Sequence, residues 1–157
     1  MAKQTTLFVG LGSSHGDDCA GWLAADLLGR RIGQHAVIRR AAAPIDLLDW
    51  LGGIDRLAIC DACQGAGPAG SWHRWAWPIP GAVQLPPRGS HDWGLSAVMR
   101  LAANLGLLPH EVLVWGVEIT AVHPGDKLSA QVSAAVGAVV EDILTRVGAM
   151  PCMNDLC

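Results

Sequence analysis

The sequence has few charged residues and no run of basic ones. Of its 157 residues, 16% are charged, and the formal net charge is −3. This composition argues against a nucleic-acid-binding protein, because such proteins carry basic patches that neutralise phosphates. No apolar run approaches the roughly 18–20 residues that cross a bilayer, and no basic-plus-apolar leader segment is present. We therefore expect a cytoplasmic protein that contacts neither membranes nor nucleic acid.

The chain has five cysteines, an odd number that leaves at least one without a disulfide partner in the chain. In a reducing compartment these residues are expected to be thiols rather than a disulfide framework. Cys60 and Cys63 form a C-x-x-C pair, but strand alternation would place Cys60 on the face opposite Asp61, which favours a packed thiol. A zinc site that adds Cys152 and Cys157 is disfavoured, because their C-x4-C spacing is unlike that of a zinc ribbon.

What the chain does contain is apolar and small. Hydrophobic residues make up 51% of it, and there are 19 glycines, a composition that fits a well-covered α/β core. The length favours one domain. We expect this domain to span 1–149, with a tail at 150–157 that has no periodicity.

The hydrophobic pattern alternates between strand-like and helix-like segments. Strands are expected over 5–10, 36–40, 56–61, 71–77 and 111–117, and helices over 18–31, 44–51, 93–105 and 128–147. The connector at 62–70 is too short for a crossover helix, so the fourth strand should run antiparallel to the third. Pro78 and Pro80 after it suggest a sheet edge. The pattern predicts a three-layer α/β/α sandwich of the phosphorylase/hydrolase-like type, with a five-stranded, mostly parallel sheet and one antiparallel strand.

Acidic residues follow two of the predicted strands. In an open parallel sheet, ligands bind beyond the carboxyl ends of the strands, where the strand order reverses. With an order beginning 2-1-3, that crevice lies between the first and third strands. Asp17 and Asp18, in "VGLGSSHGDDCAGW", leave the first strand, and Asp61 ends the third. His91, in the loop before the next helix, could reach the same edge.

The glycines of this turn permit a second interpretation, a dinucleotide site. Gly10-x-Gly12-x-x-x-Gly16 is a loose variant of that fingerprint. However, Asp17 and Asp18 lie at the helix N-terminus where a pyrophosphate would bind, and their charge opposes it.

A serine hydrolase is a third interpretation. Ser14 lies in a G-x-S-x-G match, and Asp61 with His91 or His123 could complete a triad. Such an elbow draws an oxyanion donor from an earlier strand–helix loop, and no earlier strand is predicted here.

A metal or acid–base site built from Asp18, Asp61 and His91 is the remaining chemical interpretation. Two carboxylates and one imidazole suit zinc or nickel and leave coordination positions open. Spacing alone leaves a plainer alternative, in which the aspartates only begin a helix and end a strand.

Four blocks of the chain, taken together, resemble the hydrogenase maturation endopeptidases. They read "LFVGLGSSHGDDCAGW", "LAICDACQGAGPAG", "PPRGSHDWGLSAVMRLA" and "VLVWGVEITAVHPGDKLSAQVSAAV". The resemblance implies a metal-assisted, aspartate-dependent protease that removes the C-terminal extension of a nickel-loaded hydrogenase large-subunit precursor. It also implies that Asp18, Asp61 and His91 are the catalytic and metal-binding residues.

Further expectations accompany this resemblance. Nickel would be supplied by the precursor, zinc or another divalent ion could replace it in vitro, and Asp17 or Asp61 would activate water. Asp17, Gly10 and Gly12 would support the site. We expect a monomer that binds the precursor transiently. A nickel-dependent chaperone of the same pathway, without protease activity, stays open as an alternative.

The sequence departs from the family pattern in two places. The asparagine that usually follows the second glycine is replaced by Ser13, with Ser14 after it. The block after the second strand usually reads Asp-Gly-Gly-Thr, whereas here it has Ala42 and Ala43 before a proline. The second departure removes an acid, so a fourth catalytic carboxylate is not expected.

Overall fold

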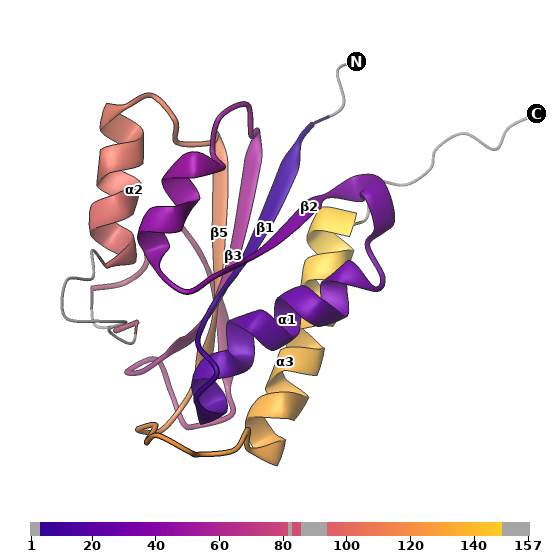
Figure 1. The fold of residues 1–157 in the computed structure, drawn as a ribbon, viewed down its shortest axis with the longest axis vertical. Coiled ribbons are helices and arrows are strands. Elements are labelled where there is room, and N and C mark those ends of the chain that lie inside the picture. Colours follow the sequence, from indigo (N-terminus) through magenta and orange to yellow (C-terminus); the bar gives the residue numbers. More distant parts are fainter. Residues whose placement is uncertain (1–3, 82, 86–93, 149–157) are drawn as a thin grey trace, which may run out of the picture.

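The computed structural model describes residues 4–81, 83–85 and 94–148 and shows one five-stranded sheet between two layers of helices (Figure 1). The strands are β1 (Thr6–Leu11), β2 (Val37–Ala41), β3 (Arg56–Cys63), β4 (Trp72–Ala76) and β5 (Glu111–Glu118). Their order is β2-β1-β3-β5-β4, parallel except for β4, which pairs antiparallel with β5. The predicted fold class is therefore confirmed, including the antiparallel fourth strand at a sheet edge.

Helices cover both faces of the sheet. On one face lie α1 (Ala20–Gly29) and α3 (Ala130–Ile143), and on the other α2 (Leu95–Asn104) and the 3-10 helix η3 (Pro44–Asp49) (Figure 1). Phe8 packs toward α1 and α3, whereas its neighbours Leu7 and Val9 pack toward α2 and η3. Because β1 and β3 are covered on both faces, they are apolar at nearly every position, as central parallel strands require.

Two predicted helices differ in detail. The segment expected to be one helix over 18–31 begins with a separate 3-10 turn, η1 (Gly16–Cys19), before α1 starts. Gly16 has φ +53, and Asp17 bonds to the start of α3 instead of to its own helix. The segment over 44–51 is a 3-10 helix of 6 residues, Pro44–Asp49, which is longer than most 3-10 helices. A short 3-10 turn (Gly33–His35) precedes β2, and α3 continues as a π-helical segment, Leu144–Gly148.

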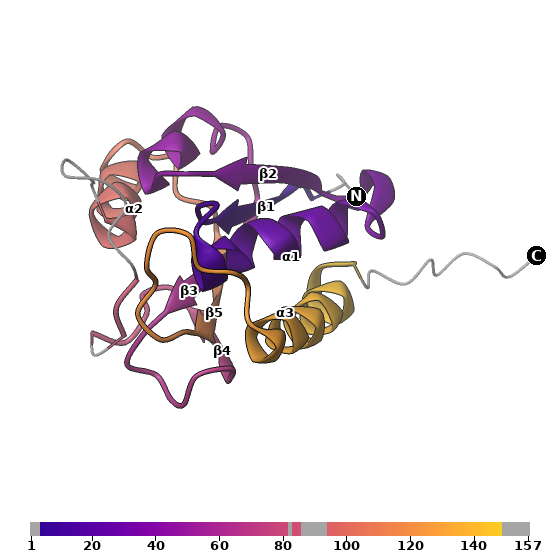
Figure 2. The same ribbon diagram turned by 60° about the horizontal axis from the view of Figure 1, so that its bottom comes forward.

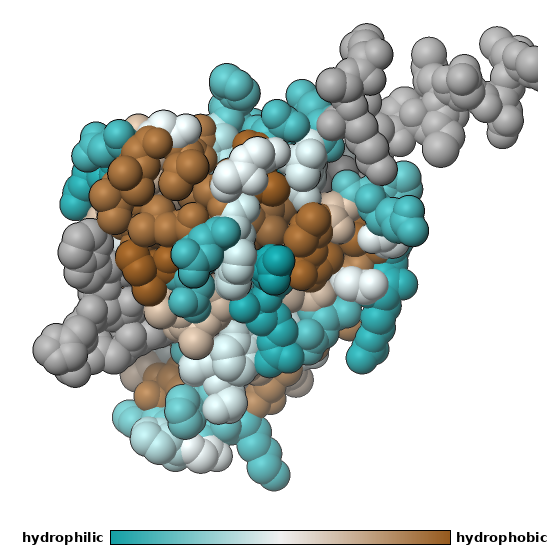
Figure 3. All heavy atoms as spheres, turned by 45° about the horizontal axis from the view of Figure 1, so that its top comes forward, coloured by the Kyte–Doolittle hydropathy of each residue, from teal (hydrophilic) through white to brown (hydrophobic). Residues whose placement is uncertain are grey.

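The chain leaves β1 toward β2 and then crosses back to β3, so the strand order reverses between β1 and β3. The segments that follow β1, β2, β3 and β5 meet at this edge, which Figure 2 brings forward. At the opposite edge, before β5, apolar side chains gather over the end of α2 (Figure 3), where Leu105 is 59% exposed. Among the described residues, no helix is long and apolar enough to span a bilayer.

Candidate functional site

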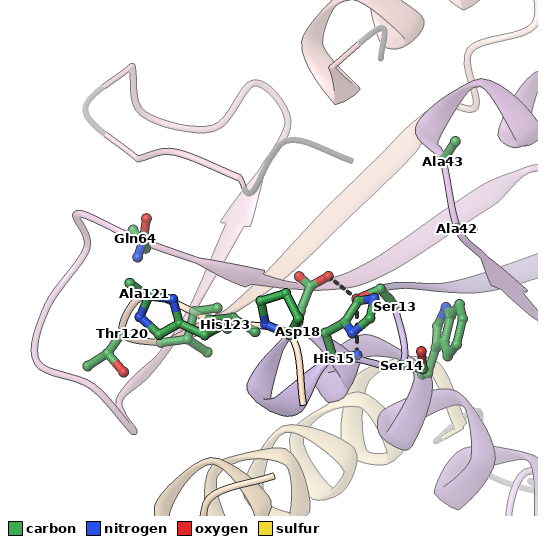
Figure 4. A pocket seen from close by; sticks show the side chains of 15 residues that line it. Ser13, Ser14, His15, Asp18, Ala42, Ala43, Gln64, Thr120, Ala121 and His123 are labelled. Carbon is green, nitrogen blue, oxygen red and sulfur yellow. Dashed lines mark hydrogen bonds between the residues drawn. The ribbon is translucent and has the colours of Figure 1, made fainter. Parts of the chain in front are cut away.

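A cleft of about 750 Å³ lies at the edge where the strand order reverses. It is lined by residues 12–15, 18 and 22 after β1, residues 42–43 after β2, Gln64 after β3, and residues 119–124 after β5. Figure 4 shows Asp18 between the turn that carries Ser13 and His15 and the segment that carries Thr120 and His123. This is the location at which open α/β sheets bind ligands.

Asp18 is held at the cleft by the turn that precedes it. The Ser13 hydroxyl donates to Asp18 Oδ2 at 2.6 Å and accepts from the His15 backbone N–H at 3.3 Å (Figure 4). The Ser13 N–H also donates to the Asp18 carbonyl at 3.1 Å. Only 8% of Asp18 is exposed. Ser13 therefore orients this carboxylate.

Two glycines of β1 and its turn make room for this arrangement. A Cβ on Gly12 would lie 2.7 Å from the Asp18 carbonyl oxygen, and one on Gly10 would lie 2.0 Å from the Gly21 carbonyl oxygen in α1. Any side chain at either position would push Asp18 or α1 away. Both glycines thus permit close backbone approach, not phosphate binding.

Asp17 has a different environment from its neighbour. Its two carboxylate oxygens accept from the Ser129 backbone N–H at 2.7 Å and from the Ser129 hydroxyl at 3.0 Å. Ser129 is the N-cap of α3 and accepts in turn from the Val132 N–H. Asp17 therefore joins the start of η1 to the start of α3, and it is not among the residues that line the cleft.

Asp61 lies inside β3 and has no exposed surface. Strand alternation places it on the face of α2 and η3, opposite Cys60, which packs in the core beneath α1 and α3. Burial, followed by the charge of Asp61, raises the pKa of the Cys60 thiol. The predicted packed thiol is confirmed.

Among the described residues, no three histidine, cysteine, aspartate or glutamate side chains are grouped so that they could hold a metal ion. His91, Cys152 and Cys157 lie outside the described residues, so the proposed ligand set and the four-thiol site stay predictions. The start of α2 is among the described residues: the helix begins at Leu95, and Gly94 is its N-cap. This places the start of α2 on the same face of the sheet as Asp61.

The geometry gives little support to a serine nucleophile. Ser14 lines the cleft but is exposed, and within the described residues its hydroxyl forms no hydrogen bond to a histidine. No described residue other than glycine has a positive φ, so Ser14 lacks that mark of backbone strain, whereas a nucleophile elbow is a strained turn.

Glu118, the last residue of β5, is a buried carboxylate that the sequence analysis missed. It accepts from the Gly65 N–H at 2.7 Å, from the Ala66 N–H at 3.1 Å and from Cys63 Sγ at 3.4 Å. It thereby fixes the turn after β3, beside Gln64 in the cleft. Burial, then the Glu118 charge, raises the pKa of the Cys63 thiol. A charged residue directly after the run VLVWGV was the available signal.

No protein-family model matches the sequence, and no curated protein matches it either. Solved structures do match. The NiFe hydrogenase maturation protease HybD from Thermococcus kodakarensis superimposes with a TM-score of 0.74 at 21% identity, over 92% of this chain and 99% of that one. The hydrogenase maturating endopeptidase HybD from E. coli gives 0.75 at 21%, over 90% and 91%.

A third solved structure, the NiFe hydrogenase maturation protease HycI from Thermococcus kodakarensis KOD1, gives a TM-score of 0.73 at 18% identity over 94% of both chains. These likenesses span nearly the whole chain and show that it has the fold of the hydrogenase maturation proteases.

Proposed function

We propose that this protein is an endopeptidase that removes the C-terminal extension of a nickel-loaded hydrogenase large-subunit precursor. The observation that carries the proposal is Asp18, oriented by Ser13 at a cleft on the switch point of this fold. The four sequence blocks and the solved structures named above support the same reaction. The protein would act in the cytoplasm, on a transiently bound partner.

The nickel ion belongs to the substrate in this scheme. Asp18, Asp61 and His91 would engage it when the precursor enters the cleft, since carboxylates and an imidazole suit such an ion. Using the ion as the recognition element would restrict cleavage to precursors that already carry it. Zinc or another divalent ion could replace nickel in vitro.

A carboxylate must also activate the attacking water. Asp17 is poorly suited, because both of its oxygens accept from Ser129. Asp61 is the better choice, because it lies near the carboxyl end of β3, beside the switch point, and its burial keeps bulk water away.

The test is the intact mass of a nickel-loaded precursor before and after incubation with the protein. Asp18→Asn, Asp61→Asn and His91→Ala should each slow the shortening by at least about 100-fold, the usual contribution of a positioned acid or base. Asp49→Asn is the matched control, because Asp49 is exposed on η3 and does not line the cleft. Its rate should equal that of the wild type.

The same assay separates the alternatives. Undiminished processing by all three site variants would refute the proposal. Loss of processing in Ser14→Ala, together with labelling by a serine-reactive phosphonate, would indicate a serine hydrolase. Binding of the precursor without any shortening would indicate a chaperone.

A further inference from the structure

The backbone beyond β5 passes the cleft without hydrogen bonds to the part of the chain that the structure describes. β5 ends with the Glu118 N–H donating to the Ser71 carbonyl at 2.9 Å, and the Ile119 N–H then donates to the Cys63 carbonyl at 3.0 Å. For residues 120–122, no backbone N–H or carbonyl forms a hydrogen bond with the described part of the chain. The chain forms no helix, strand, turn or bend from 119 to 123. We call residues 120–122 the open segment.

The open segment is anchored at both ends. Ile119 fixes its start. At its end the His123 N–H donates to Asp126 Oδ2 at 2.7 Å, and the Asp126 N–H returns to the His123 carbonyl at 3.1 Å. Asp126 also packs on Gly16, where an added Cβ would lie 2.8 Å from the Asp126 Cβ. A segment held in this way loses little conformational freedom when it binds a ligand.

The open segment forms one wall of the cleft, and the turn that carries Ser13 and Asp18 forms the facing wall (Figure 4). Three of the side chains that line the cleft are only a methyl group, those of Ala121 in the segment and of Ala42 and Ala43 after β2. Small side chains let a second main chain approach. The cleft volume, about 750 Å³, is in the range of ligand-binding sites.

We propose that the open segment is the substrate-docking strand of this protein. An extended peptide would pair with the backbone of residues 120–122, as peptides add to exposed strand edges elsewhere, and would lie between this segment and Asp18. Main-chain pairing sets the path of the peptide and tolerates different side chains, except that an acidic residue beside Asp18 is disfavoured by charge repulsion. The identity of the peptide, the junction between the hydrogenase large subunit and its extension, rests on the proposed function.

A synthetic peptide that spans this junction is the probe. Hydrogen exchange followed by mass spectrometry should show that saturating peptide slows exchange of the amides at 120–122, while exposed amides of the 3-10 turn Gly33–His35 are unchanged. Ala121→Pro removes one backbone N–H and should raise the peptide Kd about two- to tenfold, the usual effect of one hydrogen bond. Ala121→Ser keeps the N–H and should bind within twofold of the wild type.

A second measurement guards against misfolding of the proline variant. Peptides methylated at one backbone nitrogen at a time, tested on the wild-type protein, should lose affinity at alternate positions only. Absence of binding, binding without protection at 120–122, or equal affinity of all methylated peptides would each overturn the inference. Peptide binding with protection but no shortening of the precursor would leave the docking strand intact and refute the endopeptidase. Shortening of the precursor without protection of residues 120–122 by the peptide would support the endopeptidase and refute the docking strand.

Discussion

Adding one methyl group at Gly21 tests how closely α1 approaches the sheet. A Cβ at this position would lie 2.1 Å from the Leu11 carbonyl oxygen and 2.4 Å from the Cys60 carbonyl oxygen. Both obstacles are backbone atoms in central strands, so neither can rotate away as a side chain could. Relief requires α1 to move by roughly 1 Å, which is the situation in which overpacking is costly.

The magnitude follows from two opposing effects. Alanine is favoured over glycine in a helix by about 1 kcal/mol, whereas forced backbone shifts typically cost about 1–3 kcal/mol and sometimes more. With two backbone clashes, we expect Gly21→Ala to lower the free energy of unfolding by at least about 2 kcal/mol. Gly29→Ala, in the same helix, is the matched control. No atom lies within 4 Å of its added Cβ, so it should stabilise the protein by about 0.4–1 kcal/mol.

Urea unfolding at equilibrium measures both variants, with equal m values showing that the unfolded states are comparable. Because Gly21 lies just after Asp18, the folded Gly21→Ala protein should also process the precursor more slowly. Equal stability of the two alanine variants would refute the close packing of α1 on β1 and β3. Normal processing by a destabilised Gly21→Ala would refute the link between helix position and Asp18.

Two further predictions concern carboxylates outside the cleft. Asp17→Ala should cost about 1–2 kcal/mol of stability because Ser129 loses two hydrogen bonds, yet the folded variant should still process precursor; a loss as large as that of Asp18→Asn would contradict the supporting role. Burial opposes ionisation of Asp142, but hydrogen bonds from Trp115 at 2.8 Å and Arg74 at 2.6 Å, with the arginine charge, hold its pKa below the ordinary 3.8. The contribution of ionised Asp142 to the free energy of unfolding is therefore fully present above pH 3.8. It is lost as the pH falls through the lower pKa that Asp142 has in the folded protein. Asp142→Asn should cost about 1–3 kcal/mol at neutral pH, and urea unfolding should show that this difference shrinks as the pH falls below 3.8; a difference that stays constant would contradict this.

The strands and helices of this chain could be predicted from the sequence because they depend on local hydrophobic periodicity. The apolar runs around Phe8 and Ile59 require strands buried on both faces, and the short connector after Cys63 left an antiparallel fourth strand as the simplest path. The strand that pairs with this fourth strand could not be predicted from the sequence. β4 pairs with β5, which lies far along the sequence, and only packing of the whole sheet decides this.

The candidate site, too, could be predicted from the sequence only in part. The sequence by itself predicted that Asp18 and Asp61 lie at the carboxyl ends of neighbouring strands, because strand direction and order suffice for that inference, although β3 continues past Asp61 to Cys63. Only the tertiary structure assigned different partners to the adjacent Asp17 and Asp18 and recruited Glu118 to the turn after β3. It also left the backbone of residues 120–122, beside the cleft, without hydrogen bonds to the other described residues. Each of these depends on which distant backbone groups reach a given side chain or strand edge, and local periodicity carries no information about such contacts.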